Sequence, residues 1–192
     1  MMYKVTLSLH NEKGQRKYLN QEERLRFFEV TLGYGLPKRL FCQLLFYTGA
    51  RISEIYNLRT DSIDQANKTV VLETLKKRKR GIYREIPLPV TILKQLESYI
   101  HKLVCENQSV ISLWSFSLRT GSRAVKEVMT KAGITGVRSC SRGLRHGFAV
   151  YAVSKVPLTM VKKWLGHASL TTTAIYLDVI GEEEREIAKR IW

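Results

Sequence analysis

Apolar residues recur three and four positions apart over most of this chain, which is the pattern of helices that bury one face. The first such stretch follows Asn20, which can cap a helix, and Glu23 stands at the capping-box position. A helix is expected over 21–31, with Leu25, Phe28 and Leu32 turned toward the core. The same period, bounded by glycine, proline and polar residues, predicts further helices over 38–47, 52–58, 90–105, 119–131, 143–154, 158–165 and from 170 onward.

One short region departs from this period and favours strands. Residues 69–75 are rich in β-branched side chains, and residues 82–86 suit an antiparallel partner that ends at Pro87. The connection between them, 76–80 and a glycine, is nearly all basic. The pattern predicts a hairpin, or a three-stranded sheet if another strand joins it. The expected fold class is mainly α with a small antiparallel β-sheet (α+β).

Charge narrows the range of partners. The 192 residues include 32 Lys and Arg against 17 Asp and Glu, which gives a net charge of +15. An excess of this size favours a polyanionic partner, either nucleic acid or an anionic membrane. No apolar run approaches the roughly 20 residues that span a bilayer, so nucleic acid is favoured and no membrane partner is expected.

The cysteines and carboxylates argue against two kinds of site. Cys42, Cys105 and Cys140 are scattered and odd in number, and no C-x-x-C spacing occurs, so neither a disulfide framework nor a zinc site is indicated. Reduced thiols in a cytoplasmic protein fit this pattern. No carboxylate cluster has the spacing of metal ligands, and no metal or other cofactor is expected.

Two arginines and a tyrosine supply what an attack on a phosphodiester needs. A tyrosine phenol has a pKa near 10 and becomes a useful nucleophile when cations hold the target phosphate. Arginine suits that role because its planar guanidinium binds two oxygens and stays charged. Arg51 is expected at a turn between two packed helices, and Arg145 lies at a helix start or within it. Tyr176 is expected to project from the helix that begins near 170, with His167 in the loop before it.

Three short stretches resemble the signature of the tyrosine recombinases, the phage-integrase family. The chain has A-R-I-S-E-I at 50–55, R-G-L-R-H at 142–146, and L-G-H at 165–167 with Tyr176 nine residues after the histidine. Family members carry A-R-x-x-E-[IL], H-x-L-R-H and L-G-H with a tyrosine at that distance. The resemblance covers about residues 18–190, and it implies the DNA breaking-rejoining fold of the recombinase catalytic domain.

The resemblance also implies the activity, site-specific recombination of double-stranded DNA. Tyr176 would attack the scissile phosphate, forming a 3′-phosphotyrosyl intermediate and freeing a 5′-hydroxyl without ATP or metal. Arg51, Arg145 and Arg142 would hold the phosphate oxygens, and His167 would donate a hydrogen bond to one of them. Whether the outcome is integration, excision, inversion or resolution stays open, as does membership of a mobile element.

One position departs from the family motif. Arg142 stands where the family has the first histidine, and arginine cannot accept a proton. Proton acceptance from Tyr176 then falls to water or to another group. His146 lies in the middle of an expected helix, where it is interpreted as a core or supporting histidine outside the catalytic set. Glu54, one turn after Arg51, is expected to orient that arginine.

The family also uses a lysine of a β-hairpin to protonate the leaving 5′-oxygen. That lysine maps onto the basic connection, where Lys76, at the end of the first strand, is favoured and Lys79 is the alternative. Lys77 is expected to point to the other face of the strand. Together with Arg78 and Arg80, Lys77 and Lys79 are expected to contact DNA phosphates.

Size and the C-terminal pattern suggest an organisation. Residues 1–17 are interpreted as an N-terminal extension and 18–192 as the catalytic domain, without the core-binding domain that family members usually carry. The opening methionine favours a minimal form, like the fimbrial inversion recombinases, over an excised domain. A helix is expected over 182–191, with Ile187 and Ile191 on one side, which could dock within the same chain or on a neighbour. The resemblance implies docking on the neighbouring subunit in a homo-tetramer on DNA. The protein is further expected to work with an accessory DNA-binding protein and to be located at the bacterial nucleoid in the cytoplasm.

Three other functions compete with recombination. A type IB topoisomerase would share the chemistry and relax DNA without site specificity. A catalytically inactive DNA-binding regulator would keep the basic surface and lose cleavage, and the intact arginines, histidine and tyrosine argue against it. A basic helix-turn-helix transcription factor would not need Tyr176.

Overall fold

The computed structural model describes residues 8–75, 81–107, 109, 111–178, 188, 189 and 191. The helices are α1 Gln21–Thr31, α2 Leu36–Thr48, α3 Ile52–Tyr56, α4 Val90–Asn107, α5 Leu118–Lys131, α6 Ser141–Val153, α7 Leu158–Leu165 and α8 Thr171–Ala174. The strands are β1 Ile63–Asp64, β2 Thr69–Glu73 and β3 Tyr83–Pro87, and short 3₁₀ turns occupy Thr60–Ser62 and Gly136–Arg138. The expected fold class, mainly α with a small antiparallel sheet, is confirmed.

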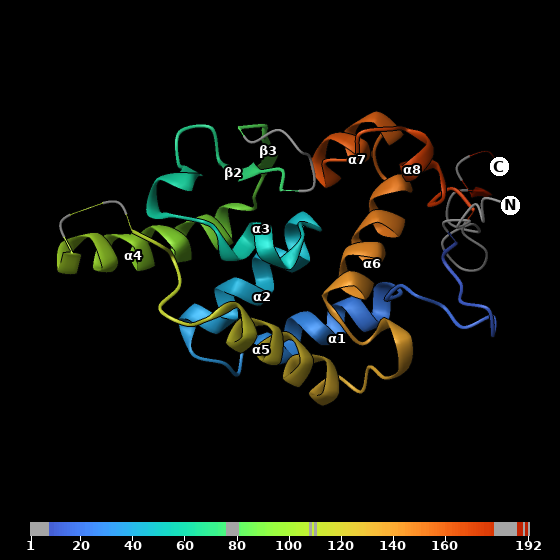
Figure 1. Ribbon diagram of the computed structural model, residues 1–192, viewed down its shortest axis with the longest axis horizontal. Coiled ribbons are helices and arrows are strands. Elements are labelled where there is room, and N and C mark those ends of the chain that lie inside the picture. The colour runs from blue at the N-terminus through green and yellow to red at the C-terminus, as the bar shows by residue number, and fades with distance from the viewer. Residues whose placement is uncertain are drawn as a thin grey trace, which may run out of the picture.

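Helix α2 lies at the centre of the fold because its apolar side chains are buried on several sides. It contacts α1, α3, α4, α5 and α6, and Leu40, Leu44 and Leu45 are inaccessible to solvent or nearly so. Figure 1 shows the sheet and α4 toward one end of the molecule and α6, α7 and α8 toward the other. Helix α2 contacts both α3 and α6. The loop between α2 and α3 and the C-terminal helix α6 therefore both lie beside this central helix.

The sheet is the predicted hairpin with a third short strand. Its order is β1-β2-β3, all antiparallel, and Leu72 pairs with Arg84 while Val70 pairs with Ile86. Side chains alternate along β3, so Arg84 and Ile86 both face inward. An arginine thus occupies an inward position of the strand, next to α7.

The capping box at the start of α1 is confirmed, but the expected buried face of that helix is wrong. Leu25 and Leu32 are 49% and 55% exposed, and the buried face runs instead through Phe27, Glu23 and Arg24. Both charged side chains have contacts there, although Arg24 Nη1 makes no hydrogen bond. Glu23 accepts from two arginines, and the Arg24 guanidinium lies over an aromatic ring.

The described part of the N-terminal extension packs against the C-terminal helices. Leu9 in the extension and Tyr18 directly after it are 4% and 3% exposed, and both belong to a cluster with Phe148, Val161 and Tyr176. An isolated bridge within 8–17 closes a small loop beside this cluster. Among the described helices, none has both the length and the apolar character needed to cross a membrane.

Candidate active site

Arg51 is mounted on a rigid turn, as its sequence position predicts. Helix α2 ends at Gly49, which has the left-handed φ of 59° that a residue with a side chain rarely adopts. Arg51 follows as the N-cap of α3. Its guanidinium Nη1 lies 2.7 Å from Glu54 Oε1, and its backbone N–H donates to Oε2 of the same carboxylate at 2.9 Å. Glu54 therefore holds both the backbone and the side chain of Arg51.

The same carboxylate holds a second arginine that sequence reasoning missed. Arg84 Nη2 donates to Glu54 Oε2 at 2.6 Å, its Nη1 donates to the Thr74 hydroxyl at 3.0 Å, and its Nε donates to the Trp164 carbonyl at 2.7 Å. Arg84 thus ties the hairpin to α7. A signal existed, because the period of two along the strand puts residue 84 on the same face as Ile86.

These contacts keep Glu54 ionised although its side chain is fully buried. Burial by itself raises the pKa of the carboxyl, but the hydrogen bond and charge of Arg84, followed by those of Arg51, lower the pKa below its ordinary value. Glu54 is the shared counter-ion of a buried arginine and of a candidate phosphate ligand.

Replacing Glu54 with glutamine is expected to lower the free energy of unfolding by about 3 kcal/mol, because the buried guanidinium of Arg84 loses its counter-charge. Urea unfolding of wild type and variant measures the difference. The control is Glu97→Gln, since Glu97 is exposed on α4. Equal stability losses in the two variants would mean that the buried ion pair contributes nothing.

Arg145 lies within α6 with its guanidinium between the ends of two other helices. Nη1 donates to the Gly49 carbonyl and Nη2 to the Leu165 carbonyl, both at 2.8 Å. Burial, and then the charge of Arg51, lowers the pKa of Arg145 to about 10, which still leaves it cationic at neutral pH. Gly166, the left-handed C-cap of α7 with φ of 65°, allows the chain to turn away directly after the second carbonyl.

His167 lies in the loop after α7, as expected, and contacts Arg145. Its Nε2 is 3.2 Å from Arg145 Nη2, and its Nδ1 is 2.9 Å from the Thr173 hydroxyl. Since arginine only donates, Nε2 accepts in this arrangement, and the hydrogen-bond network assigns the imidazole proton to Nδ1. Thr173 holds the His167 ring through this hydrogen bond. The sequence pattern placed Thr173 one turn before Tyr176, on the same face of the expected helix.

Tyr176 does not project from a helix, contrary to the sequence-based expectation. Helix α8 ends at Ala174, and the chain then tightens, since the Tyr176 N–H donates to the Thr173 carbonyl at 3.1 Å in an i, i+3 contact. The tyrosine side chain is 1% exposed, and its ring stacks on His167 at an interplanar angle of 15°. Burial raises the pKa of the Tyr176 phenol, and the charges of Arg145 and Arg51 act in the opposite direction.

The structure brings His146 against the tyrosine hydroxyl, although the sequence pattern placed it outside the catalytic set. Its Nδ1 lies 2.9 Å from Tyr176 Oη. No spacing in the sequence signals this pair, because the contact depends on how the end of the chain returns to α6. Burial, and then the charges of Arg145, Arg142 and Lys17, lower the pKa of His146 to about 4, so the imidazole is neutral at physiological pH.

The remaining expected site residues are either exposed at the edge of this cluster or outside the described part of the chain. Arg142 is exposed on the first turn of α6, where its charge reaches His146. The expected general acid Lys76, its alternative Lys79 and the expected DNA contacts lie outside the described residues, and so does most of 182–191. Within the described ranges, His, Cys, Asp and Glu form no group of three that could hold a metal ion.

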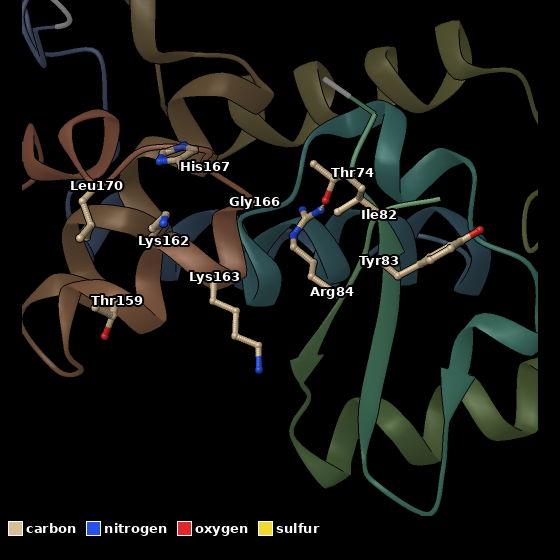
Figure 2. A pocket seen from close by; sticks show the side chains of 10 residues that line it. All are labelled: Thr74, Ile82, Tyr83, Arg84, Thr159, Lys162, Lys163, Gly166, His167 and Leu170. Carbon is tan, nitrogen blue, oxygen red and sulfur yellow. Dashed lines mark hydrogen bonds between the residues drawn. The ribbon is translucent and has the colours of Figure 1, made fainter. Parts of the chain in front are cut away.

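A pocket of about 290 Å³ opens between the hairpin and α7, on the side of the cluster where His167 is partly exposed. Figure 2 shows its side chains, with the Arg84 guanidinium directed toward Thr74 and Lys163 extended from α7. The pocket is lined by Thr74, Ile82, Tyr83, Arg84, Thr159, Lys162, Lys163, Gly166, His167 and Leu170. Two lysines, an arginine and a histidine give this opening a surface that suits an anion.

Comparisons with known proteins find relatives over most of this chain. The chain is 30% identical over 181 residues to the tyrosine recombinase XerA of Pyrococcus furiosus, covering 91% of this chain and 61% of that protein. Among solved structures, a XerA recombinase superposes with a TM-score of 0.76 at 25% identity, over 91% of this chain and 64% of that one. The XerH site-specific recombinase bound to its difH substrate, in a pre-cleavage complex, gives a TM-score of 0.71 at 22% identity, over 95% and 59% of the two chains.

These similarities cover 91% to 95% of this chain, while the chain spans about three fifths of the length of the XerA relative. Residues 17–183 match the phage integrase family, a range that includes all three sequence stretches and the cluster built from them. The chain therefore belongs to the phage integrase family, the tyrosine recombinases.

Proposed function

We propose that this protein is a site-specific recombinase that cleaves and rejoins double-stranded DNA through Tyr176. One observation carries the proposal: Arg145 joins the loop that bears Arg51 to the loop that bears His167, and Tyr176 stacks on that histidine. All four groups come from one chain. The net charge of +15 supports a polyanionic substrate.

In the proposed reaction Arg51 and Arg145 hold the non-bridging oxygens of the scissile phosphate. A guanidinium has five N–H groups, enough for Arg145 to donate to the Gly49 and Leu165 carbonyls and to a phosphate oxygen together. With a proton on Nε2 in the DNA complex, His167 would donate to a phosphate oxygen instead of accepting from Arg145. Arg142 adds positive charge from the first turn of α6.

Cleavage replaces one phosphodiester bond with another. Tyr176 Oη bonds to phosphorus, the bond to the 5′-oxygen breaks, and that oxygen takes a proton from Lys76, with Lys79 as the alternative donor. The 3′-phosphotyrosyl link conserves the bond energy, so that a 5′-hydroxyl from another strand can reverse the step without ATP. Stabilisation of the charged transition state by cations is the main contribution expected of the site.

The reaction is tested by covalent capture. Purified protein is incubated in EDTA with duplex DNA of randomised sequence that carries a nick, so that the short cleaved fragment diffuses away and religation fails. We expect an SDS-stable adduct whose tryptic nucleotide-peptide contains Tyr176. Absence of any adduct, with this pool and with the DNA that flanks the gene, would overturn the proposal, and plasmid relaxation without strand joining would indicate a type IB topoisomerase.

The organisation of the protein is part of the proposal. Residues 18–192 would form the catalytic domain after an extension of 1–17, a division supported by the family match over residues 17–183. A homo-tetramer on DNA, joined through 182–191, would bring four active sites together, with an accessory DNA-binding protein at the bacterial nucleoid in the cytoplasm. Inverted repeats beside the gene would favour inversion, and a phage or transposon boundary would favour a mobile element.

A further inference from the structure

The proposed reaction leaves one step without a residue, the removal of the proton from the Tyr176 hydroxyl. Arg142 occupies the motif position at which the family has a histidine, and a guanidinium does not accept protons. The Glu54 carboxylate is engaged by two arginines in the core. His167 presents Nε2 to Arg145 and Nδ1 to Thr173. None of these three groups has a contact described here through which it would accept the proton of the Tyr176 hydroxyl.

His146 contacts the Tyr176 hydroxyl directly. Its Nδ1 lies 2.9 Å from Tyr176 Oη, inside the range of about 2.6–3.2 Å that a general base requires. The two rings are tilted by 49° with centroids 5.8 Å apart, so the contact is made edge to edge through the nitrogen and the hydroxyl. His146 directly follows Arg145 on α6, and one helix therefore carries both a phosphate ligand and the group beside the nucleophile.

We propose that His146 is a catalytic residue that accepts the Tyr176 proton, in place of the histidine that position 142 lacks. This role rests on the proposed function. As Tyr176 Oη bonds to phosphorus, its proton moves to Nδ1 of His146, and the electron pair of the O–H bond becomes the new O–P bond. The 5′-oxygen leaves with the pair of the broken P–O bond and takes its proton from the hairpin lysine. During rejoining, the imidazolium returns its proton to the departing tyrosine.

The charges around His146 keep it neutral before DNA binds. Burial, together with the charges of Arg145, Arg142 and Lys17, lowers the pKa of the imidazole, which also makes it a weaker base in the free protein. In the tautomer with its proton on Nε2, Nδ1 presents a lone pair to the phenol. A DNA phosphate bound by Arg51 and Arg145 adds negative charge beside the same ring. That charge offsets the arginines and favours the imidazolium at the moment when the proton moves.

The experiment compares His146→Asn with wild type in single-turnover formation of the covalent adduct, on a sequence recovered by the capture described above. Asparagine can place an amide oxygen near the position of Nδ1 and accept a hydrogen bond, but it cannot take a proton. We expect the rate to fall by about 100-fold or more, with DNA affinity and melting temperature close to wild type. His101→Asn is the matched control, since His101 is exposed on α4.

Two further readouts separate proton transfer from positioning. A substrate with a 5′-bridging sulfur, whose leaving group needs no proton, should restore the rate of a lysine variant but not of His146→Asn. The adduct rate of His146→Asn should rise with pH between 6 and 9 more steeply than that of wild type, because hydroxide replaces the missing base on the order of tenfold per unit.

The outcomes distinguish this role from the proposed function. A wild type that forms no adduct overturns the proposed function and this role with it. A wild-type adduct formed no faster than that of His146→Asn overturns only the role of His146, as does rescue of the variant by the sulfur substrate. Nitrogen-15 NMR of the histidines adds an independent check, because a neutral His146 whose proton is on Nδ1 in the wild-type protein would exclude acceptance at that atom.

Discussion

Replacing Tyr176 with phenylalanine is expected to abolish the covalent DNA adduct while leaving DNA binding within about twofold of wild type. The phenyl ring preserves the buried packing of a side chain that is 1% exposed and stacked on His167, and removes only the oxygen that would bond to phosphorus. Loss of the contact with His146 should cost about 1 kcal/mol of stability, too little to unfold the domain.

The measurement is the yield of SDS-stable adduct on captured DNA, with binding followed separately by fluorescence anisotropy. The control is Tyr151→Phe, because Tyr151 is 37% exposed on α6, the helix that also carries Arg145 and His146. Equal adduct yields from wild type and Tyr176→Phe would show that Tyr176 is not the nucleophile, whatever its position in the cluster.

Replacing Arg145 with lysine is expected to slow adduct formation by about 1000-fold at saturating DNA, although the positive charge is retained. The guanidinium spans the Gly49 and Leu165 carbonyls, each at 2.8 Å, and reaches His167 at 3.2 Å. An ammonium is a compact donor group that cannot span these positions and a phosphate oxygen at once. The catalytic loss should therefore come from geometry rather than from charge.

The same substitution should lower the free energy of unfolding by about 2 kcal/mol, because two carbonyls at buried helix ends lose their donor. Single-turnover rates at a temperature well below the melting point of the variant keep the two effects apart. Arg123→Lys, on the exposed face of α5, is the control. A lysine variant that reacts within tenfold of wild type would mean that charge alone suffices at this position.

Local structure was predictable where the signal lies within one element. The capping box of α1, the left-handed glycines that end α2 and α7, and the antiparallel hairpin all follow from short-range residue chemistry. The buried face of α1 did not, because Glu23 and Arg24 are buried against partners far along the chain, while Leu25 on the same helix is exposed. Hydrophobicity by itself cannot identify a charged side chain that has a buried partner.

The ends of elements were also less predictable than the elements themselves. Tyr176 was expected on a helix because the residues from 170 onward continue a helical pattern. In the structure α8 ends at Ala174, and i, i+3 hydrogen bonds tighten the turn that carries the tyrosine. Arg84 was missed because an arginine on a strand is usually exposed to solvent. Only the tertiary structure shows that its guanidinium is buried against Glu54.

By itself the sequence determined the family and the order of Arg51, Arg145, His167 and Tyr176. It also determined the turns on which Arg51 and His167 lie. Those properties depend on residue identity and short spacing, which a linear chain displays directly. Only the tertiary structure decided that His146 meets the Tyr176 hydroxyl, across 30 residues of sequence. A helical period defines the faces of α6 relative to its own axis, whereas packing of the chain's end against α6 selects which side chain reaches the phenol.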